Sequence, residues 1–356
     1  MKSSYGDNFI LSIFGESHAP AIGMTLTGIP AGLPVDMEKL QSFLKRRAPG
    51  QNAWSTPRKE ADVPEFECGI ENGCTNGQPI TAVIYNKNTR SGDYDNVKTC
   101  PRPGHADFCA YVKDGEIPAG GGRFSGRMTA PLCIAGGMCK QWLEAMGIQI
   151  GAHILKIGTA EDIAFNALQP QLSQVRQDFP TLSQAAAEAM QAQIAEAKKD
   201  GDSIGGWIEC AVTGLPVGIG DALFDGVESH IAQIIYGIPA VKELSFGDTQ
   251  DFGSANNDAY TTENGQVKTL TNHCGGILGG ITNGMPVIFK VRFKPTPSIL
   301  REQQTVDLRT GEITTLQVQG RHDPCIVPRA VPVVEAAAAM ALYDMILGDA
   351  QKDGRN

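Results

Sequence analysis

The order of strand-like and helix-like stretches is the feature of this 356-residue chain that most restricts its fold. Residues 287–294 alternate apolar and polar side chains, which predicts a strand, whereas residues 181–199 and 332–347 predict helices. The patterns do not alternate regularly, no repeat period is present, and no low-complexity linker divides the chain. We therefore expect a single α+β domain over residues 1–350, followed by a frayed tail over residues 351–356.

Shorter patterns predict further elements and their ends. Strands are expected over residues 9–14 and 80–85, and helices over residues 36–47 and 125–146. In the second helical segment, Pro131 suggests that the regular helix starts near that residue. Asp36 is the expected N-cap of its helix, and Thr181 with Gln184 fits a capping box. Gly348 is expected to end the last helix, because glycine is common just beyond helix C-termini.

Composition excludes several classes of function. The net charge of −9 argues against nucleic acid as a partner, because nucleic-acid-binding proteins are usually basic. No run of about 18 apolar residues predicts a membrane span, and the N-terminus does not resemble a signal peptide. The nine cysteines are not paired in zinc-type motifs, and no close histidine pair suggests a metal. We expect a cytoplasmic protein with reduced thiols.

Three histidines lie in turns rich in glycine or proline. The stretches are Gly15-Glu16-Ser17-His18, Arg102-Pro103-Gly104-His105-Ala106-Asp107 and Gly320-Arg321-His322-Asp323-Pro324-Cys325. Turns often carry reacting side chains, and histidine exchanges a proton readily near neutral pH. The alternative is that each imidazole only bonds to a neighbouring turn, which is the more frequent role of a single histidine.

Basic residues gather near these turns in an otherwise acidic chain. Residues 45–60 hold Lys45, Arg46, Arg47, Arg58 and Lys59 against the single acid Glu60. Clustered guanidiniums suit phosphates and carboxylates, although cations at a helix C-terminus also balance the helix dipole. The run Gly120–Ser125 precedes a helix and is compatible with phosphate binding, but a lone glycine run is more often a plain turn. Further arginines beside the histidine motifs favour a polyanion pocket: Arg102, Arg123, Arg127, Arg321 and Arg329.

Taken in order, these motifs resemble the chorismate synthase family nearly end to end. Other matching stretches are Arg46–Gln51, Thr56–Asp62, Gly120–Arg127, Gly201–Gly205, Asn272–Gly280 and Lys294–Ser298. The resemblance implies a β-α-β sandwich with antiparallel sheets packed around helices, assembled as a homotetramer. It implies a carbon–oxygen lyase of the shikimate pathway. That enzyme eliminates phosphate from 5-enolpyruvylshikimate 3-phosphate in a 1,4-anti sense, giving chorismate, and needs reduced FMN without net redox change.

The same resemblance implies roles for individual residues. His18 matches the acid for the departing phosphate, His105 the group that protonates reduced flavin near N1, and Asp323 the carboxylate near flavin N5. Substrate anions are assigned to Arg46, Arg47, Arg58, Arg127 and Arg329. Flavin contacts are assigned to Arg123, Phe124, Ser125, Pro239, Ala240, Gly279, Lys294, Pro295, Thr296, Pro297, Ser298 and Arg321.

The chain departs from the family pattern at Ala19, Ala48, Ala53 and Pro239, whereas the proposed acid–base trio is intact. These departures keep open the alternative of a protein that binds flavin and substrate without turnover. A phosphatase-like hydrolase that uses a basic pocket and histidine is the other alternative. We predict that reduced FMN comes from an external flavin reductase, with NADPH as the indirect reductant.

Overall fold

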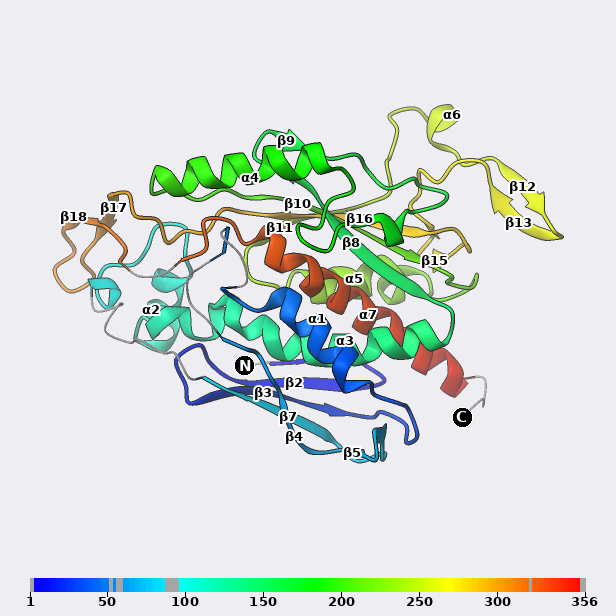
Figure 1. Ribbon diagram of the computed structural model, residues 1–356, viewed down its shortest axis with the longest axis horizontal. Coiled ribbons are helices and arrows are strands. Elements are labelled where there is room, and N and C mark those ends of the chain that lie inside the picture. The colour runs from blue at the N-terminus through cyan, green and yellow to red at the C-terminus, as the bar shows by residue number, and fades with distance from the viewer. Residues whose placement is uncertain (1–2, 51–53, 56–59, 87–95, 320–321, 353–356) are drawn as a thin grey trace.

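The computed structural model describes residues 3–50, 54–55, 60–86, 96–319 and 322–352, and Figure 1 shows their arrangement. Two five-stranded antiparallel sheets enclose a layer of helices. The first sheet has the order β1-β2-β3-β7-β4, and the second has the order β11-β16-β10-β8-β9. The predicted α+β class and the antiparallel sheets around helices are confirmed.

The strands of the first sheet are β1 (Ser4–Tyr5), β2 (Ile10–Gly15), β3 (Ala21–Thr27), β4 (Glu65–Cys68) and β7 (Ile80–Tyr85). Those of the second are β8 (Gln149–Ile157), β9 (Ala160–Glu161), β10 (Gly206–Thr213), β11 (Val241–Phe246) and β16 (Val287–Phe293). Short hairpins add β5 (Ile70–Glu71) with β6 (Cys74–Thr75), β12 (Tyr260–Glu263) with β13 (Gln266–Thr269), β14 (Ile277–Leu278) with β15 (Ile281–Thr282), and β17 (Gln303–Val306) with β18 (Ile313–Leu316).

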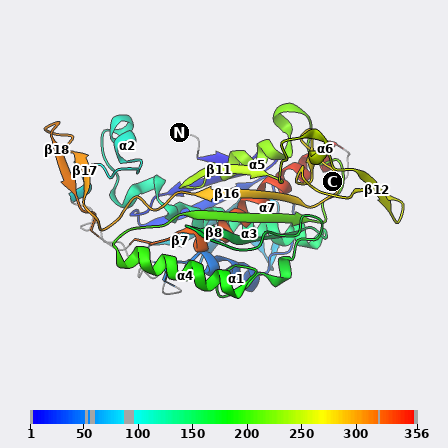
Figure 2. The ribbon, with the colours of Figure 1, turned by 90° about the horizontal axis from the view of Figure 1, so that it is seen from above.

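The helices are α1 (Met37–Arg47), α2 (Asp107–Asp114), α3 (Thr129–Ala145), α4 (Gln184–Lys199), α5 (Val227–Ile235), α6 (Gly253–Asn256) and α7 (Val327–Lys352). Single 3₁₀ turns are η2 (Ala119–Phe124), η3 (Gly126–Met128), η4 (Leu172–Gln174) and η5 (Leu223–Asp225). Helices α1, α3 and α7 lie between the sheets, whereas α4 lies on the outer side of the second sheet (Figure 1). In Figure 2 the β17–β18 hairpin and α2 lie at one end of the molecule, opposite β12.

Helix α7 is the centre of the hydrophobic core. Its residues Ala336–Ala339 are fully buried, as expected for a helix that is apolar on every side. It packs closely on α3, because a Cβ built on Gly136 would lie 2.4 Å from the Cβ of Ala336. By length and composition alone, the stretch Val327–Ala350 would be long and apolar enough to cross a membrane, but 94% of its most apolar window is buried inside the protein.

Several predicted boundaries agree with the structure. Helix α1 begins after Asp36, whose side chain accepts a hydrogen bond from the backbone N–H of Lys39 at 2.9 Å. Strand β7 has the predicted bounds, and β16 ends one residue earlier than expected. Helix α3 begins at Thr129, so Pro131 lies in its first turn, where a missing N–H is tolerated.

Two predicted helix ends are wrong. The N-cap of α4 is Ser183, whose hydroxyl accepts from the N–H of Ala186, while the Thr181 hydroxyl donates to the carbonyl of Ser183. Gly348 does not end α7, which continues to Lys352 and so includes the first two residues of the expected tail. A Cβ at Gly348 would lie 2.6 Å from the amide nitrogen of Asn8, so this glycine provides close packing inside the helix.

Candidate active site

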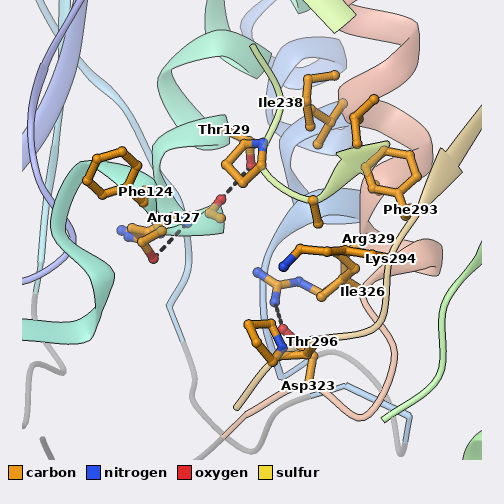
Figure 3. A pocket seen from close by; sticks show the side chains of 18 of the residues that line it. Phe124, Arg127, Thr129, Ile238, Phe293, Lys294, Thr296, Asp323, Ile326 and Arg329 are labelled. Atoms are coloured by element: carbon orange, nitrogen blue, oxygen red, sulfur yellow. Dashed lines mark hydrogen bonds and ion pairs between the residues drawn. The ribbon is translucent and has the colours of Figure 1, made fainter. Parts of the chain in front are cut away.

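A cavity of about 540 Å³ opens where the helical layer meets the second sheet, a size typical of sites for small ligands. Its walls come from segments that are distant in sequence: Ser17, the end of α1 with Pro49, residues 102–106, the turn 120–129, the segment 236–241, residues 293–298, and residues 322–333 around the start of α7. Figure 3 shows side chains from these segments around the same space, among them Arg127, Lys294 and Arg329.

The glycine run at residues 120–122 lets two imidazoles approach the backbone. All three glycines have positive φ (62°, 81° and 49°), a conformation that other L-residues rarely adopt. A Cβ at Gly120 would lie 2.0 Å from Cε1 of His18, and a Cβ at Gly121 would lie 3.1 Å from Nε2 of His105. The run therefore brings together two of the three predicted proton-transfer residues. This packing is its structural function, and phosphate binding is not required to explain the glycines.

His105 is oriented by a buried carboxylate. Its Nδ1 lies 2.5 Å from Oδ1 of Asp107, the fully buried first residue of α2. Asp107 also accepts hydrogen bonds from Nε and Nη2 of Arg102 at 2.7 and 2.8 Å. Burial lowers the pKa of His105, the bond to Asp107 opposes this effect, and Arg102 adds to it. The resulting pKa lies below the ordinary value, so the ring is neutral at rest.

A second buried carboxylate organises the arginines of the cavity. Asp62, 2% exposed, pairs through Oδ2 with Arg47 and through Oδ1 with Arg127. Burial alone would raise the pKa of Asp62, but the two guanidiniums outweigh it and hold the pKa below its ordinary value. Arg47 makes two further bonds, to Oγ1 of Thr129 at 3.2 Å and to the carbonyl of Gly126 at 3.3 Å. Its donors are therefore largely used within the protein.

The predicted carboxylate Asp323 also lines the cavity and is paired with Arg329. Nη1 of Arg329 lies 2.5 Å from Oδ2 of Asp323, and Nε of Arg329 donates to the carbonyl of Arg47 at 3.0 Å. The ion pair holds one carboxylate oxygen of Asp323 against Arg329 at the cavity wall. Figure 3 shows the pair beside Lys294 and Thr296.

The cavity is strongly cationic although the chain carries a net charge of −9. Among the described lining residues six are basic, Arg47, Arg102, Arg123, Arg127, Lys294 and Arg329, whereas Asp323 is the single acid. Three of the six are matched by Asp62 and Asp107 behind the wall, which leaves positive charge for a ligand. Burial, with a smaller effect of Lys242, lowers the pKa of Lys294. Polyanions with phosphate or carboxylate groups are the ligands that this wall favours.

Two polar atoms in the cavity wall mark positions for ligand atoms. Nη2 of Arg127 and Oγ1 of Thr296 are buried and have no hydrogen-bond partner among the described residues. Buried polar groups are normally satisfied, so such an atom at a cavity wall indicates a missing bound partner. A guanidinium donor and a hydroxyl fit an anionic or carbonyl oxygen. The residues therefore suit a ligand that carries such oxygens.

The other predicted flavin and substrate residues fall into three groups. The cavity wall includes Arg123, Phe124, Ser125, Pro239, Ala240, Pro297 and Ser298. Gly279, Pro295 and Arg46 are not among the described lining residues; Arg46 instead binds Glu335 through two hydrogen bonds of 2.9 and 2.6 Å. Arg58 and Arg321 lie outside the described residues.

Two described residues of this site, Asp62 and Asp107, received no role from the sequence. Asp62 and Asp107 lie inside motifs that were recognised. The sequence did not indicate, however, that these two carboxylates are buried and that each binds more than one partner. Arg102 and His322 also line the cavity, and burial lowers the pKa of His322. A rule that every buried guanidinium needs a carboxylate would have singled out Asp62 and Asp107.

Fold and site together define an α+β sandwich protein with a cationic ligand cavity lined by His105 and His322, beside which His18 packs on Gly120. The sequence profile of the chorismate synthase family matches residues 9–347. A chorismate synthase of Lancefieldella parvula is 46% identical, covering 97% of this chain and 96% of that protein, and one of Dehalococcoides mccartyi is 42% identical, covering 98% and 97%. A solved structure described as a crystal structure of chorismate synthase superposes with a TM-score of 0.75 at 26% identity, covering 97% of this chain and 93% of that one. The chain belongs to the chorismate synthase family.

Proposed function

We propose that this protein converts 5-enolpyruvylshikimate 3-phosphate to chorismate and phosphate by 1,4-anti elimination, with reduced FMN as cofactor. The observation that carries the proposal is a cavity wall with six cations and one acid, placed against His18 and His105. The substrate has one phosphate and two carboxylates, so it requires several cations at once. Family membership supports the same reaction.

The cations would bind and orient the substrate. Arg127 offers a buried donor without a protein partner, and Arg329 reaches the same space from the other side. Holding an anion between fixed guanidiniums keeps the reacting bonds in position and excludes water from them. Arg47 acts mainly as support, because its donors bond to Asp62, Thr129 and Gly126.

Three residues would handle protons. His18 is positioned at the glycine turn to protonate the departing phosphate oxygen, which makes phosphate a better leaving group. His105, oriented through Nδ1 by Asp107, lines the cavity and would share a proton with the bound cofactor there. Asp323, held at the cavity wall by its pair with Arg329, would accept the proton that the substrate loses. These roles fit residues that lie at the wall or pack against it.

The residues that would hold FMN are Arg123, Phe124, Ser125, Pro239, Ala240, Lys294, Thr296, Pro297 and Ser298, all of which line the cavity. Reduced FMN supplies electron density that promotes loss of the phosphate, and it is regenerated without net redox change. Thr296 and Ser298 offer hydroxyls, and Lys294 offers a cation held to the carbonyl of Gly104. Oligomeric assembly as a homotetramer and supply of reduced FMN by an external reductase, with NADPH as its electron source, are further parts of this proposal.

One anaerobic assay tests the reaction. Purified protein with chemically reduced FMN and 5-enolpyruvylshikimate 3-phosphate should release equal amounts of chorismate and phosphate, and oxidised FMN should give neither. Phosphate release without flavin would instead indicate a hydrolase. Tight binding of both ligands without product would indicate a protein that does not turn over. Turnover with NADPH and FMN alone in air would contradict the need for an external reductase.

A further inference from the structure

Asn86 lies between the ligand-facing arginine and the histidine turn. It directly follows β7, and its side chain is partly buried. Oδ1 of Asn86 accepts a hydrogen bond from Nε of Arg127 at 3.0 Å. Nδ2 donates to the carbonyl of Ala19 at 2.7 Å and reaches that of Glu16 at 3.4 Å. The amide orientation is unambiguous, because a guanidinium can only donate and a carbonyl can only accept.

The backbone of Asn86 adds a further link to the histidine turn, since its N–H donates to the carbonyl of Pro20 at 2.9 Å. On the other side of the turn, Ser17 N–H donates to the carbonyl of Gly122 at 3.3 Å. His18 is thus held between the glycine run and the residue that follows β7. The side chain and the backbone of Asn86 both contribute to this anchoring, so one residue supplies three of the hydrogen bonds that hold the turn.

The two bonds of Arg127 leave one defined donor for the ligand. Nη1 is paired with Asp62, Nε is bound by Asn86, and Nη2 is the buried atom without a protein partner among the described residues. With Nε and Nη1 fixed, the planar guanidinium cannot rotate, so the direction of Nη2 is set. Asn86 therefore fixes both the cation that meets an anionic group and the turn of the imidazole that serves the same group.

We propose that Asn86 is a positioning residue that couples Arg127 to the His18 turn, so that the phosphate-binding cation and the proton donor for the departing phosphate keep a fixed separation. This inference rests on the proposed function for the roles of Arg127 and His18. The coupling itself rests on the hydrogen bonds of one amide. No described bond gives Asn86 a direct place at the ligand, and it does not appear among the described lining residues.

Two substitutions at position 86 distinguish the hydrogen bond of Asn86 to Arg127 from its side-chain hydrogen bonds to the histidine turn. Asn86→Asp keeps an oxygen for Nε of Arg127 but loses the donor to Ala19 and Glu16, and it places an oxygen against their carbonyls. Its kcat should fall about tenfold while KM for the substrate stays within about twofold of wild type. Asn86→Ala loses both halves, so kcat should fall similarly and KM should rise about fivefold or more.

A double-mutant cycle tests whether Asn86 acts through Arg127. Asn86→Ala should reduce kcat/KM clearly less in an Arg127→Met background than in the wild type, because part of its effect is already removed. Full additivity of the two substitutions would overturn the coupling. Asn166→Asp and Asn166→Ala are matched controls, since Asn166 is an exposed residue whose amide oxygen serves only its own turn.

A measurement that does not depend on turnover tests this inference separately from the proposed reaction. Amide hydrogen exchange in the peptide containing residues 16–20 should be at least about threefold faster in Asn86→Asp and Asn86→Ala than in wild type, and unchanged in the Asn166 variants. Unchanged exchange in both Asn86 variants would overturn the inference, whether or not wild type makes chorismate. If wild type makes no chorismate but exchange rises as expected, the coupling stands and the reaction assignment fails.

Discussion

Oδ1 of Asp107 lies 2.5 Å from Nδ1 of His105, and this bond fixes the orientation of the imidazole ring at the cavity wall. Asp107→Asn should reduce kcat by at least about tenfold, because an amide can present a donor to Nδ1 and favour the wrong tautomer. It also removes the carboxylate that raises the pKa of His105, so the midpoint reporting His105 should move to lower pH. Steady-state rates across pH measure both effects. Asp178→Asn, an exposed ion-paired aspartate, is the control; an unchanged pH profile in Asp107→Asn would refute the orientation role.

Protonation of Asp62 should lower the free energy of unfolding in acid. Its pKa is held below the ordinary 3.8, so its stabilising effect is present above pH 3.8 and is lost as pH falls through the folded-state pKa. Asp62→Asn should lower the free energy of unfolding at neutral pH by about 3–5 kcal/mol, since two buried guanidiniums lose their partner. Urea unfolding at a series of pH values should show the gap to wild type closing in acid. A gap independent of pH would contradict the ion-pair explanation.

Substitution of Arg127 should mainly reduce catalysis, whereas substitution of Arg46 should mainly reduce stability. Arg127→Met should reduce kcat/KM about 100-fold, because it removes the buried donor at the cavity wall. Arg46→Met should leave KM within about twofold but should lower stability, since Glu335 is 2% exposed and would lose its guanidinium partner. Kinetics and thermal unfolding of the two variants test this. A large KM change in Arg46→Met would return Arg46 to the substrate site.

Gly120 predicts a steric effect on His18. Its φ of 62° is strained for alanine, and a Cβ would lie 2.0 Å from the imidazole. Gly120→Ala should therefore displace His18 and reduce kcat at least about tenfold. Gly115→Ala is the matched control, because Gly115 also has positive φ (85°), but a Cβ at that position would meet no atom within 4 Å. Equal losses of activity in the two variants would show that backbone strain, not contact with His18, is responsible.

The contribution of His153 to the free energy of unfolding should depend on pH in the opposite direction to that of Asp62. It is fully buried between Glu209, 3.0 Å from Nε2, and Asp162, 3.4 Å from Nδ1. Burial lowers its pKa, but the two carboxylates outweigh this and raise the pKa above 6.5. The stabilisation is therefore complete below pH 6.5 and is lost as pH rises through the folded-state pKa. Urea unfolding should show wild type losing free energy of unfolding relative to His153→Gln as pH rises above 6.5; parallel pH curves would count against a charged His153.

The sequence predicted the elements with strong periodicity and the motifs that carry chemistry. Strand 80–85 and the start of the helix after Asp36 follow from local patterns alone, so they were predictable. The cavity placement of Arg127, Arg329 and Asp323 followed from motif resemblance. What local patterns could not supply was the pairing of charges across distant segments, such as Arg46 with Glu335, because that depends on tertiary packing.

The incorrect sequence predictions have the same cause, because they too depend on tertiary packing. Gly348 has the sequence signature of a helix end, but the approach of Asn8 makes it an interior packing position. Thr181 fits a capping box by spacing, yet Ser183 lies where the backbone turns into α4. Asp62 and Asp107 are ordinary acids in the printed sequence, and only burial beside guanidiniums makes them organising residues.

The contact between Gly136 and Ala336 has a consequence for ligand selection. The first turns of α3 and α7 line the cavity, and the two helices pack against each other at this contact. A methyl group added at position 136 would meet Ala336, and we expect it to push the two helices apart. A pair of small residues in the middle of the core thus contributes to the width of the ligand site, although neither is among the described residues that line it.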